Sequence, residues 1–342
     1  MTKIVQFSEF GGPEVLQLIE VELRAPSEGE VKLAVKAIGL NRAETMLREN
    51  QYIFTPDLPS GLGYDASAEV IAIGPNVTGI SVGDKVITIP GFSQSTNGVY
   101  GEEAVVPANA CWPWPEGLSA EEAACVGTNY TTAYFGLKSV GQLNEGDTVL
   151  LTAATGGVGF AAIEIAKELN AICIATTRKR NKVQALVDAG ADYVIVTSEE
   201  DLVSRVQEIT DGNGVQVVFD AIAGQMIPKS IECLGPGGRC VIYGIVDRSS
   251  PELEVMPFMV KGLSILSHAV VYFTGYPDLG LPQNLAAIKE AQEFLLPKLA
   301  NGRFKPKISE IFTLETVADA HRALESNNQI GKIVLSVAGH SQ

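Results

Sequence analysis

Hydrophobic and polar residues alternate in short runs along the first third of the chain. Glycine- and proline-containing turns at 11–13 and 26 separate the first of these runs. Alternation with a period of two, bounded by turn residues, is typical of β-strands. Residues 39–48 are the exception and are predicted to form a short helix or turn. Because strands dominate the rest, this third of the chain is predicted to be an all-β domain. The predicted strands are 3–7, 16–21, 30–36, 68–73 and 82–89.

The pattern changes at Ser119. Glu122 follows Ser119 at the spacing of a capping box, which predicts that a helix begins there. Short apolar runs then alternate with segments of helical periodicity, which predicts a parallel sheet with helices on both faces. The predicted strands are 148–152, 171–176, 193–196, 216–220, 239–244 and 263–270. The predicted helices are 130–140, 157–169, 180–189, 200–210, 224–234 and 256–261.

The last part of the chain returns to a mixed pattern. Helices are predicted at 285–301 and 315–325, and strands at 307–313 and 331–337. The simplest arrangement of these patterns is an α/β protein in which a parallel-sheet domain is inserted into a split β-rich domain.

A glycine-rich turn joins the first predicted strand of the inserted domain to a helix. After the apolar run 148–152 come Thr155, Gly156, Gly157, Val158 and Gly159. Backbone at such a turn can approach a pyrophosphate, and the helix N-terminus supplies free N–H groups. The motif departs from G-x-G-x-x-G because Ala154 replaces the first glycine. The turn therefore predicts a dinucleotide site, and the alternative is a tight strand–helix turn that binds no ligand.

Composition and charge narrow the classes of function. A length of 342 residues suggests about two domains. The formal net charge of −15 argues against nucleic acid or an anionic membrane as a partner. No apolar run is long enough for a membrane span, and the N-terminus has no signal-peptide pattern, so we expect a cytoplasmic protein. The 5 cysteines are scattered and there are only 3 histidines, which does not suit a metal centre.

The end of the second strand of the inserted domain indicates which dinucleotide is bound. An NAD site carries an acidic residue about twenty residues past the glycines. Here the strand ends at Thr177, and the cations of residues 178–182 follow. They suit the 2′-phosphate of NADPH, with Arg178 and Lys182 as the main contacts. The alternative is a solvated, basic helix start.

Several short segments along the chain match a known group of proteins. They are Gly39-Leu-Asn41, Pro59–Asp65, Val82–Val86, Tyr100-Gly-Glu102, Thr131–Tyr134, Ala153–Gly159, Ala189–Asp192 and Gly331–Val334. In these segments the chain resembles the medium-chain dehydrogenase/reductase superfamily, and within it the zinc-independent, quinone oxidoreductase-like members. The resemblance implies a GroES-like catalytic domain at 1–123 and 277–342 and a Rossmann NADP-binding domain at 124–276. It also implies hydride transfer in the cleft between them and a homodimer paired through the strand at 263–271.

The resemblance also implies that no metal is bound. Zinc-containing relatives place a cysteine at Asn41 and a histidine at Tyr64, so only Glu44 and Asp65 remain of the usual surroundings. The implied activity is NADPH-dependent reduction of a quinone or an α,β-unsaturated carbonyl compound. An enoyl-thioester reductase is the alternative. A zinc-type alcohol dehydrogenase and a non-enzymatic NADPH-binding protein are weaker alternatives.

The resemblance names the residues that surround the reacting groups. Asn41 matches an asparagine beside the nicotinamide and substrate, although a turn-capping asparagine is the alternative. Tyr52 matches an active-site tyrosine whose phenol, with a pKa near 10, can donate a proton to an enolate. Tyr64 is either a further donor or a plug at the lost histidine position. Thr132 matches a residue near the nicotinamide.

Other positions are assigned by the same comparison. The backbone of Tyr243, Gly244 and Ile245 is expected to meet the carboxamide of the cofactor. A tyrosine and an arginine that bind phosphate in relatives are absent near Thr197 and Asn327. His268 and His321 are interpreted as structural residues rather than catalytic ones.

Overall fold

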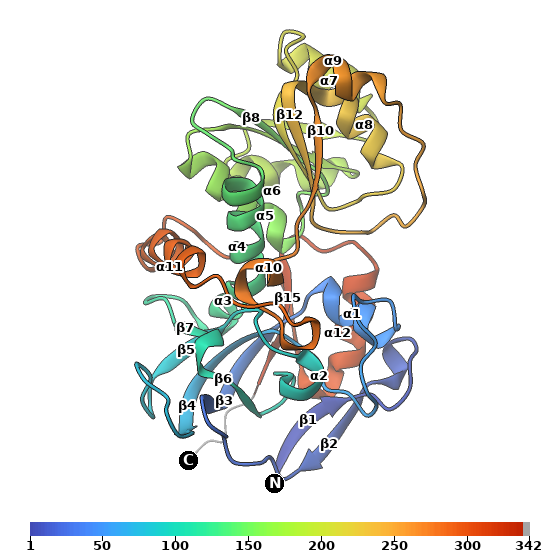
Figure 1. The fold of residues 1–342 in the computed structure, drawn as a ribbon. Helices are drawn as coiled ribbons and strands as arrows, with labels where there is room; N and C mark the ends of the chain where they lie inside the picture. The colour runs from blue at the N-terminus through green and yellow to red at the C-terminus, as the bar shows by residue number, and fades with distance from the viewer. Residues whose placement is uncertain (338–342) are drawn as a thin grey trace. The chain divides into compact units, whose positions relative to one another are not determined.

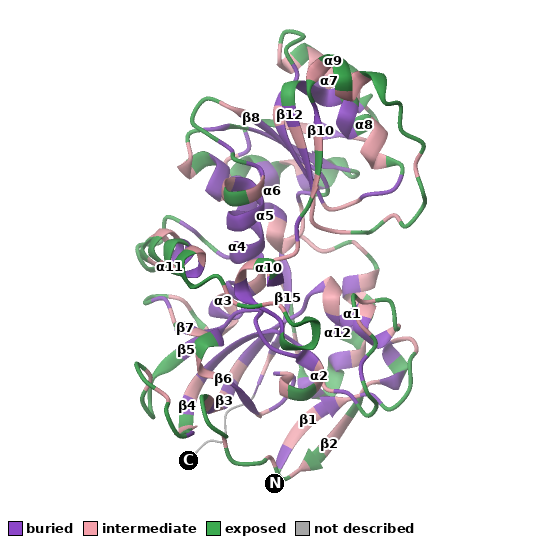
Figure 2. Cartoon of the chain, in the orientation of Figure 1, coloured by how far each residue is buried: buried purple, intermediate pink, exposed green. Residues whose placement is uncertain are grey.

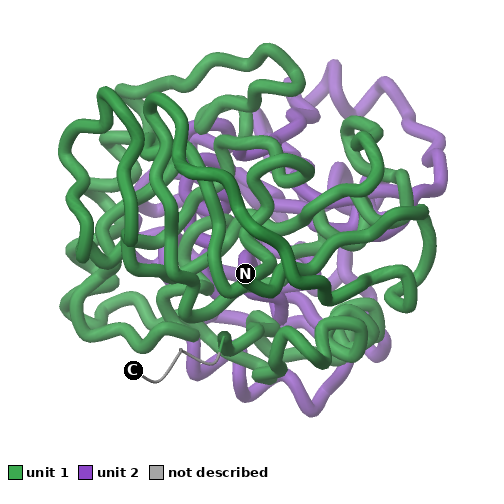
Figure 3. Tube along the Cα trace, turned by 90° about the horizontal axis from the view of Figure 1, so that it is seen from below, with its two compact units in different colours: residues 1–128, 271–342 green, residues 129–270 purple. Residues whose placement is uncertain are grey.

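A computed structural model describes residues 1–337 (Figure 1), and these residues form two compact units. Unit 1 comprises residues 1–128 together with the described residues from Val271 onward, and unit 2 comprises residues 129–270. Figure 3 colours the two units separately. The chain therefore leaves the first unit, builds the second and returns.

The sheet of unit 2 has six strands, and every neighbouring pair is parallel. Its order is β10-β9-β8-β11-β12-β13, which is the strand order 3-2-1-4-5-6 of a dinucleotide-binding fold. The predicted doubly wound parallel sheet is confirmed. The strands are β8 (Thr148–Leu151), β9 (Ile172–Thr177), β10 (Tyr193–Val196), β11 (Val215–Asp220), β12 (Leu234–Ile242) and β13 (Ser264–Ser267).

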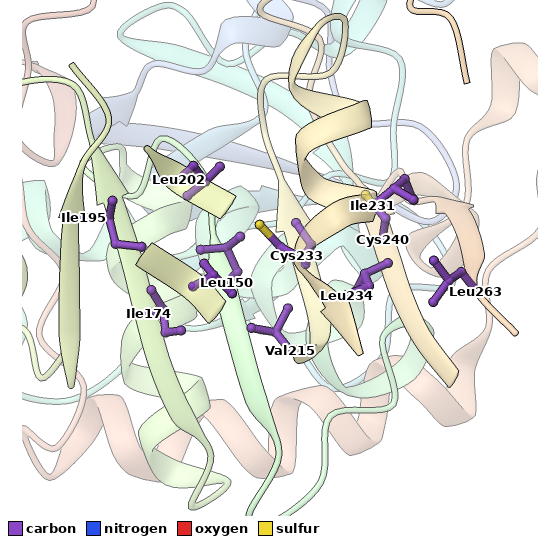
Figure 4. Packing of buried hydrophobic residues seen from close by; sticks show 12 residues of the cluster. Leu150, Ile174, Ile195, Leu202, Val215, Ile231, Cys233, Leu234, Cys240 and Leu263 are labelled. Carbon is purple, nitrogen blue, oxygen red and sulfur yellow. The ribbon is translucent and has the colours of Figure 1, made fainter. Parts of the chain in front are cut away.

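Helices cover both faces of this sheet. On one face, Leu150 and Val218 belong to a buried cluster with residues of α7 (Leu202–Ile209) and α8 (Met226–Cys233). Figure 4 labels Leu150, Leu202 and Ile231 of this cluster. Phe219 points to the opposite face, because neighbouring strand residues alternate. There its ring lies so close to Gly136 that a Cβ on that glycine would come within 2.3 Å. Both faces of the sheet are therefore covered by packed residues, as is usual for a parallel sheet.

The remaining helices of unit 2 follow the predicted alternation. α4 (Gly127–Tyr134) continues into a wider π-type helix at Phe135–Val140, where a single helix at 130–140 is predicted from the sequence. The others are α5 (Gly157–Glu168), α6 (Val183–Asp188) and α9 (Met256–Lys261). No residue of α9 is buried, whereas the four residues of β8 all are, as Figure 2 shows by colour.

One strand prediction is wrong in extent. The apolar pattern predicts a strand through 263–271, but β13 ends at Ser267. His268 lies just past that end, and Val271 begins a short helix, α10 (Val271–Thr274), in unit 1. A short apolar run does not distinguish a buried strand from a buried helical turn, which explains the error.

Unit 1 is built on a seven-stranded sheet of order β14-β15-β3-β4-β5-β7, with β6 also paired to β3. β1 and β2 form a separate antiparallel pair. Inward and outward residues alternate along the first part of β3, as the sequence pattern predicts. The strands are β1 (Thr2–Gln6), β2 (Gln17–Val21), β3 (Glu30–Gly39), β4 (Asp65–Ile73), β5 (Lys85–Thr88), β6 (Glu103–Pro107), β7 (Cys111–Pro113), β14 (Ile308–Thr313) and β15 (Lys332–Ser336).

The helices of unit 1 are short except near the end of the chain. The predicted capping box at Ser119 is confirmed, because its hydroxyl accepts from the Glu122 N–H at 3.2 Å and the Glu122 carboxylate accepts from the Ser119 N–H at 2.8 Å. The helices are α1 (Arg42–Arg48), α2 (Gln94–Asn97), α3 (Ala120–Ala123), α10, α11 (Leu285–Ala300) and α12 (Val317–Glu325). Short 3-10 turns of unit 1 lie at Pro13–Val15, Ala108–Ala110, Pro277–Leu279 and Leu314–Thr316, and one of unit 2 lies at Arg180–Lys182. Among the helices of residues 1–337, none is both long and apolar enough to cross a membrane.

Candidate active site

The glycine turn of unit 2 has the geometry of a phosphate-binding corner. It connects β8 to α5, and Gly156 caps the helix. A Cβ at Gly159 would come within 2.3 Å of the Ala154 carbonyl oxygen, so the helix packs on the turn only with glycine there. A Cβ at Gly156 would meet nothing within 4 Å. Protein packing therefore leaves Gly156 open, as a closely approaching pyrophosphate would need.

The neighbours of Gly156 are accessible at the surface, although Gly157 is closely packed. Thr155, Gly157 and Val158 are all partly exposed. A Cβ at Gly157 would come within 2.3 Å of the Asn129 amide nitrogen. The turn thus presents main-chain atoms at its surface while its base is closely packed, and the residues present fit a dinucleotide phosphate.

A cluster of positive charge lies where β9 ends. Thr177 is buried at the last position of the strand, and Lys182 is buried in the 3-10 turn that follows. Burial lowers the pKa of Lys182, and the nearby charges of Lys179 and Arg178 lower it further. A phosphate dianion bound here would offset that mutual repulsion. The cluster fits the 2′-phosphate of NADPH.

Arg180 belongs to the same basic segment but has a different partner. Its Nε donates to Glu199 Oε2 at 2.7 Å, and its Nη2 donates to the same carboxylate oxygen. Arg180 therefore has a carboxylate partner within the protein.

The end of β12 supplies the backbone that the resemblance assigns to the carboxamide. Tyr243 stacks on Phe219 with ring centroids 4.0 Å apart and an interplanar angle of 19°. A Cβ at Gly244 would come within 2.6 Å of the Ala221 carbonyl oxygen, so only glycine fits this close approach. Ile245 follows as an exposed residue. These contacts fix the path of the backbone just after the strand.

His268 supports another predicted cofactor contact, Thr132. Its Nε2 lies 3.0 Å from the Thr132 carbonyl oxygen, which can only accept, so Nε2 carries the proton. Burial lowers the pKa of His268 to about 4, and the ring stays neutral at pH 7. His268 therefore positions α4, which agrees with its interpretation as a structural histidine.

In unit 1, Asn41 is fully occupied by neighbours. It caps α1, and its side-chain nitrogen donates to Asp65 Oδ2 at 3.1 Å and to Glu44 Oε1 at 3.2 Å. Its side-chain oxygen accepts from the Lys332 ammonium at 2.6 Å. An amide has two N–H donors and one oxygen, and both ends are engaged here. These contacts fit the capping alternative, and a contact between Asn41 and substrate stays a prediction.

Asp65 is the centre of this buried network. One carboxylate oxygen accepts from the Thr128 main-chain N–H at 2.8 Å and from the Thr128 hydroxyl at 2.7 Å. The other accepts from Asn41 and lies 2.5 Å from Lys332 Nζ. Glu44 lies beside them, and burial raises its pKa to about 8 despite the Lys332 charge. At neutral pH the Glu44 carboxyl group is therefore largely protonated beside the Asp65–Lys332 ion pair.

Three tyrosine hydroxyls form a chain in the same unit. The Tyr52 and Tyr64 oxygens are 3.3 Å apart, and Tyr64 donates to the Tyr276 hydroxyl at 3.0 Å. Tyr64 and Tyr276 are buried and Tyr52 is partly exposed. Burial raises the pKa of Tyr52 to about 12, and it also raises the pKa values of Tyr64 and Tyr276 above their usual value. All three are therefore neutral O–H donors at pH 7.

Aromatic contacts hold these rings in place. Phe54 lies 5.6 Å from Tyr52 and 5.5 Å from Tyr276, measured between ring centroids. Phe92 meets Tyr64 edge-on at 5.7 Å. The hydroxyl chain thus runs through an aromatic cluster with a partly exposed end at Tyr52.

Comparison with known proteins identifies the family. Sequence models described as "Alcohol dehydrogenase GroES-like domain" and "Zinc-binding dehydrogenase" match residues 27–116 and 157–281. The quinone oxidoreductase of Salmonella typhimurium is 34% identical over 98% of this chain and 99% of its own length. The chain belongs to the quinone oxidoreductase family of the medium-chain dehydrogenase/reductase superfamily.

Solved structures of similar proteins share this architecture. Escherichia coli quinone oxidoreductase complexed with NADPH has a TM-score of 0.86 and 30% identity, over 98% of this chain and 99% of that one. An NAD-dependent alcohol dehydrogenase has a TM-score of 0.88 and 29% identity, over 99% of this chain and 100% of that one. The predicted fold class and superfamily are confirmed.

One of the matching family descriptions names zinc, which raises the question of whether this chain has residues that could bind the metal. In residues 1–337, no group of three or more histidine, cysteine, aspartate and glutamate side chains could hold a metal ion. Tyr64 and Asn41 supply neither an imidazole nor a thiolate, and Asp65 is already bound to Lys332 and Thr128. Such a donor set does not fit zinc.

Two residues of this family member's site had no specific role in the sequence analysis. The sequence suggests only that the segment 272–276 shapes a substrate pocket, and the fold brings Tyr276 of that segment to Tyr64. Lys332 falls inside a quoted family segment but received no role, although a lysine that opens an otherwise apolar strand is a signal of a buried counter-charge.

Proposed function

We propose that this NADPH-dependent oxidoreductase reduces a quinone or an α,β-unsaturated carbonyl compound without a metal ion. The observation that carries the proposal is the chain of neutral hydroxyls from Tyr52 through Tyr64 to Tyr276. Reduction of these acceptors develops negative charge on an oxygen, and positioned O–H donors can stabilise it. Asn41 and Tyr64 supply neither a thiolate nor an imidazole, which supports a reaction that needs no zinc.

The cofactor residues belong to unit 2. The glycine turn at 155–159 would hold the pyrophosphate, and Arg178 with Lys182 would hold the 2′-phosphate. Thr177 at the strand end, Thr132, and the backbone at 243–245 complete the proposed set. When bound, NADPH supplies the hydride. The missing acidic residue at the end of β9 favours NADPH over NADH.

Unit 1 handles the proton. Tyr52 is the partly exposed end of the hydroxyl chain and is assigned as the donor to the acceptor oxygen. Its raised pKa keeps it protonated at neutral pH. Tyr64 supports Tyr52 by hydrogen bonding, and Asn41 is assigned to hold α1 and the Asp65–Lys332 pair rather than the substrate.

The test is NADPH oxidation by chelator-treated protein with a panel of quinones, free enones, enoyl thioesters and alcohol–aldehyde pairs, with NADH in parallel. Turnover of a quinone or enone with NADPH preferred supports the proposal. Preference for enoyl thioesters would move the enzyme to the alternative class. Activity that appears only with added zinc and alcohols would overturn it.

We also propose a homodimer that pairs β13 across a two-fold axis. β13 lies at an edge of the sheet, and Met256, Met259 and Val260 of the neighbouring α9 are each more than 60% exposed. An open edge beside exposed apolar side chains is suited to a partner strand. Light scattering should give twice the chain mass for the wild type and a lower mass for Ile265→Lys. A monomeric wild type would contradict the proposal.

A further inference from the structure

The direction of the tyrosine hydrogen bonds has a chemical consequence. Tyr64 donates its hydroxyl proton to Tyr276, across 3.0 Å. A phenol carries one proton, so Tyr64 can only accept from Tyr52 in this arrangement. The proton of Tyr52 therefore points into the chain until an acceptor oxygen draws it outward.

Tyr276 is a firmly held acceptor. Its main-chain N–H and C=O pair with Leu281 at 2.9 and 3.0 Å, and its ring packs against Phe54 and Tyr64. The position of its hydroxyl oxygen is thus set by backbone and ring packing, independently of Tyr52.

We propose that Tyr276 is a positioning residue whose hydroxyl oxygen competes with that of Tyr52 for the single proton of Tyr64. The inference rests on the proposed function, because it takes Tyr52 as the proton donor. As the Tyr52 O–H bond breaks, its proton forms an O–H bond on the reduced acceptor, whose hydride comes from NADPH. Tyr64 then turns its O–H from Tyr276 toward the Tyr52 phenolate, and water restores the proton of the partly exposed Tyr52.

The competition predicts opposite effects for two conservative changes. Without the Tyr276 hydroxyl, the Tyr64 proton has no second acceptor, so the Tyr52 phenolate is better stabilised. Without the Tyr64 hydroxyl, that phenolate loses its donor. Glu44 faces Tyr52 and Asp278 faces Tyr276, and both groups remain in every variant. A Tyr276 that only filled space would leave Tyr52 unchanged.

The experiment places a fluorinated tyrosine at position 52 and follows its titration by fluorine NMR in the protein without cofactor. The fluorinated phenol is more acidic than tyrosine, which lowers the pH range over which position 52 titrates. Tyr276→Phe should lower the midpoint by about one pH unit, and Tyr64→Phe should raise it by a similar amount. Tyr100→Phe is the matched control, because its buried hydroxyl has no hydrogen-bond partner among residues 1–337.

A midpoint that stays unchanged or rises in Tyr276→Phe would overturn the inference. The readout is separate from turnover. If the titration midpoint shifts as expected in both variants but the protein reduces none of the acceptors, the proposed function is wrong. If the protein reduces an acceptor but the midpoint does not shift, only the role of Tyr276 is wrong.

Discussion

The Lys332 ammonium lies 2.5 Å from Oδ2 of Asp65, and both side chains are at most 2% exposed. This ion pair links β15 to β4. It also connects α1 through Asn41 and the start of α4 through Thr128. A buried pair of this kind is tolerable because Lys332 also donates to Asn41, and Asp65 also accepts from Asn41 and Thr128.

Breaking this pair should be costly. We expect Lys332→Met to lower the free energy of unfolding by about 3–5 kcal/mol, because the Asp65 carboxylate would remain buried without its counter-charge. Adding Asp65→Asn should restore part of the loss. Urea unfolding measures both. The exposed pair Lys289–Glu293 is the control, and Lys289→Met should change stability by less than about 1 kcal/mol. An unchanged stability in Lys332→Met would contradict the described network.

Glu44 should make stability depend on pH. Its folded pKa of about 8 lies above the unfolded value near 4.3, so the folded state retains a proton that the unfolded state loses. The stabilisation from Glu44 is present below the unfolded pKa and is lost as the pH rises toward 8. Each unit of pKa difference corresponds to about 1.4 kcal/mol.

The comparison of wild type with Glu44→Gln, unfolded in urea at pH 5.5 and 8.5, isolates this effect. Glutamine does not ionise, so the free energy of unfolding of the variant, relative to that of the wild type, should be higher at pH 8.5 than at pH 5.5. Glu293→Gln on the surface is the control. An equal difference between Glu44→Gln and wild type at both values would mean that Glu44 is ionised throughout.

Lys182 and Arg180 should differ in their effect on cofactor choice. Lys182→Ala should raise the Kd for NADPH about tenfold or more and leave the Kd for NADH almost unchanged, because a charged hydrogen bond to phosphate is lost. Arg180→Ala is the matched control, since Arg180 is paired with Glu199. Fluorescence titration with both cofactors gives the four values. Equal weakening of both cofactors by Lys182→Ala would contradict the assignment.

Two glycines of the same turn should fail in different ways. Gly159→Ala should destabilise the protein, because its Cβ would meet the Ala154 carbonyl oxygen at 2.3 Å. Gly156→Ala should fold normally, because nothing lies within 4 Å of its Cβ, but should bind NADPH more weakly. Thermal unfolding without cofactor and NADPH titration separate the effects. Normal NADPH affinity in Gly156→Ala would remove the pyrophosphate from this turn.

Local patterns predicted most of the fold. The capping box at Ser119 and the glycine turn after β8 are both determined by residues close in sequence, and both are found as predicted. The end of β13 was misplaced because a short apolar run fits either a strand or a buried helical turn. Where β13 ends depends on packing in the fold, which the local pattern does not contain.

The candidate site was less accessible from sequence. The family resemblance suggested Tyr52 and Tyr64 as proton donors, which stays a prediction, whereas the hydroxyl of Tyr276 reaches Tyr64 only through a contact between residues 212 positions apart. Asn41 was matched by type to a substrate contact, whereas its amide is engaged by Asp65, Glu44 and Lys332. Hydrogen-bond saturation is a property of the folded network and cannot be inferred from residue identity alone.

The most direct test of the central claim is NADPH oxidation by metal-free protein with a quinone acceptor, wild type against Tyr52→Phe. We predict turnover by the metal-free wild type and a kcat lower by about 100-fold in Tyr52→Phe, with NADPH affinity unchanged, because only the proton donor is removed. Equal rates in the two proteins would contradict the role of Tyr52. Wild-type turnover that requires added zinc would contradict the zinc-free mechanism itself.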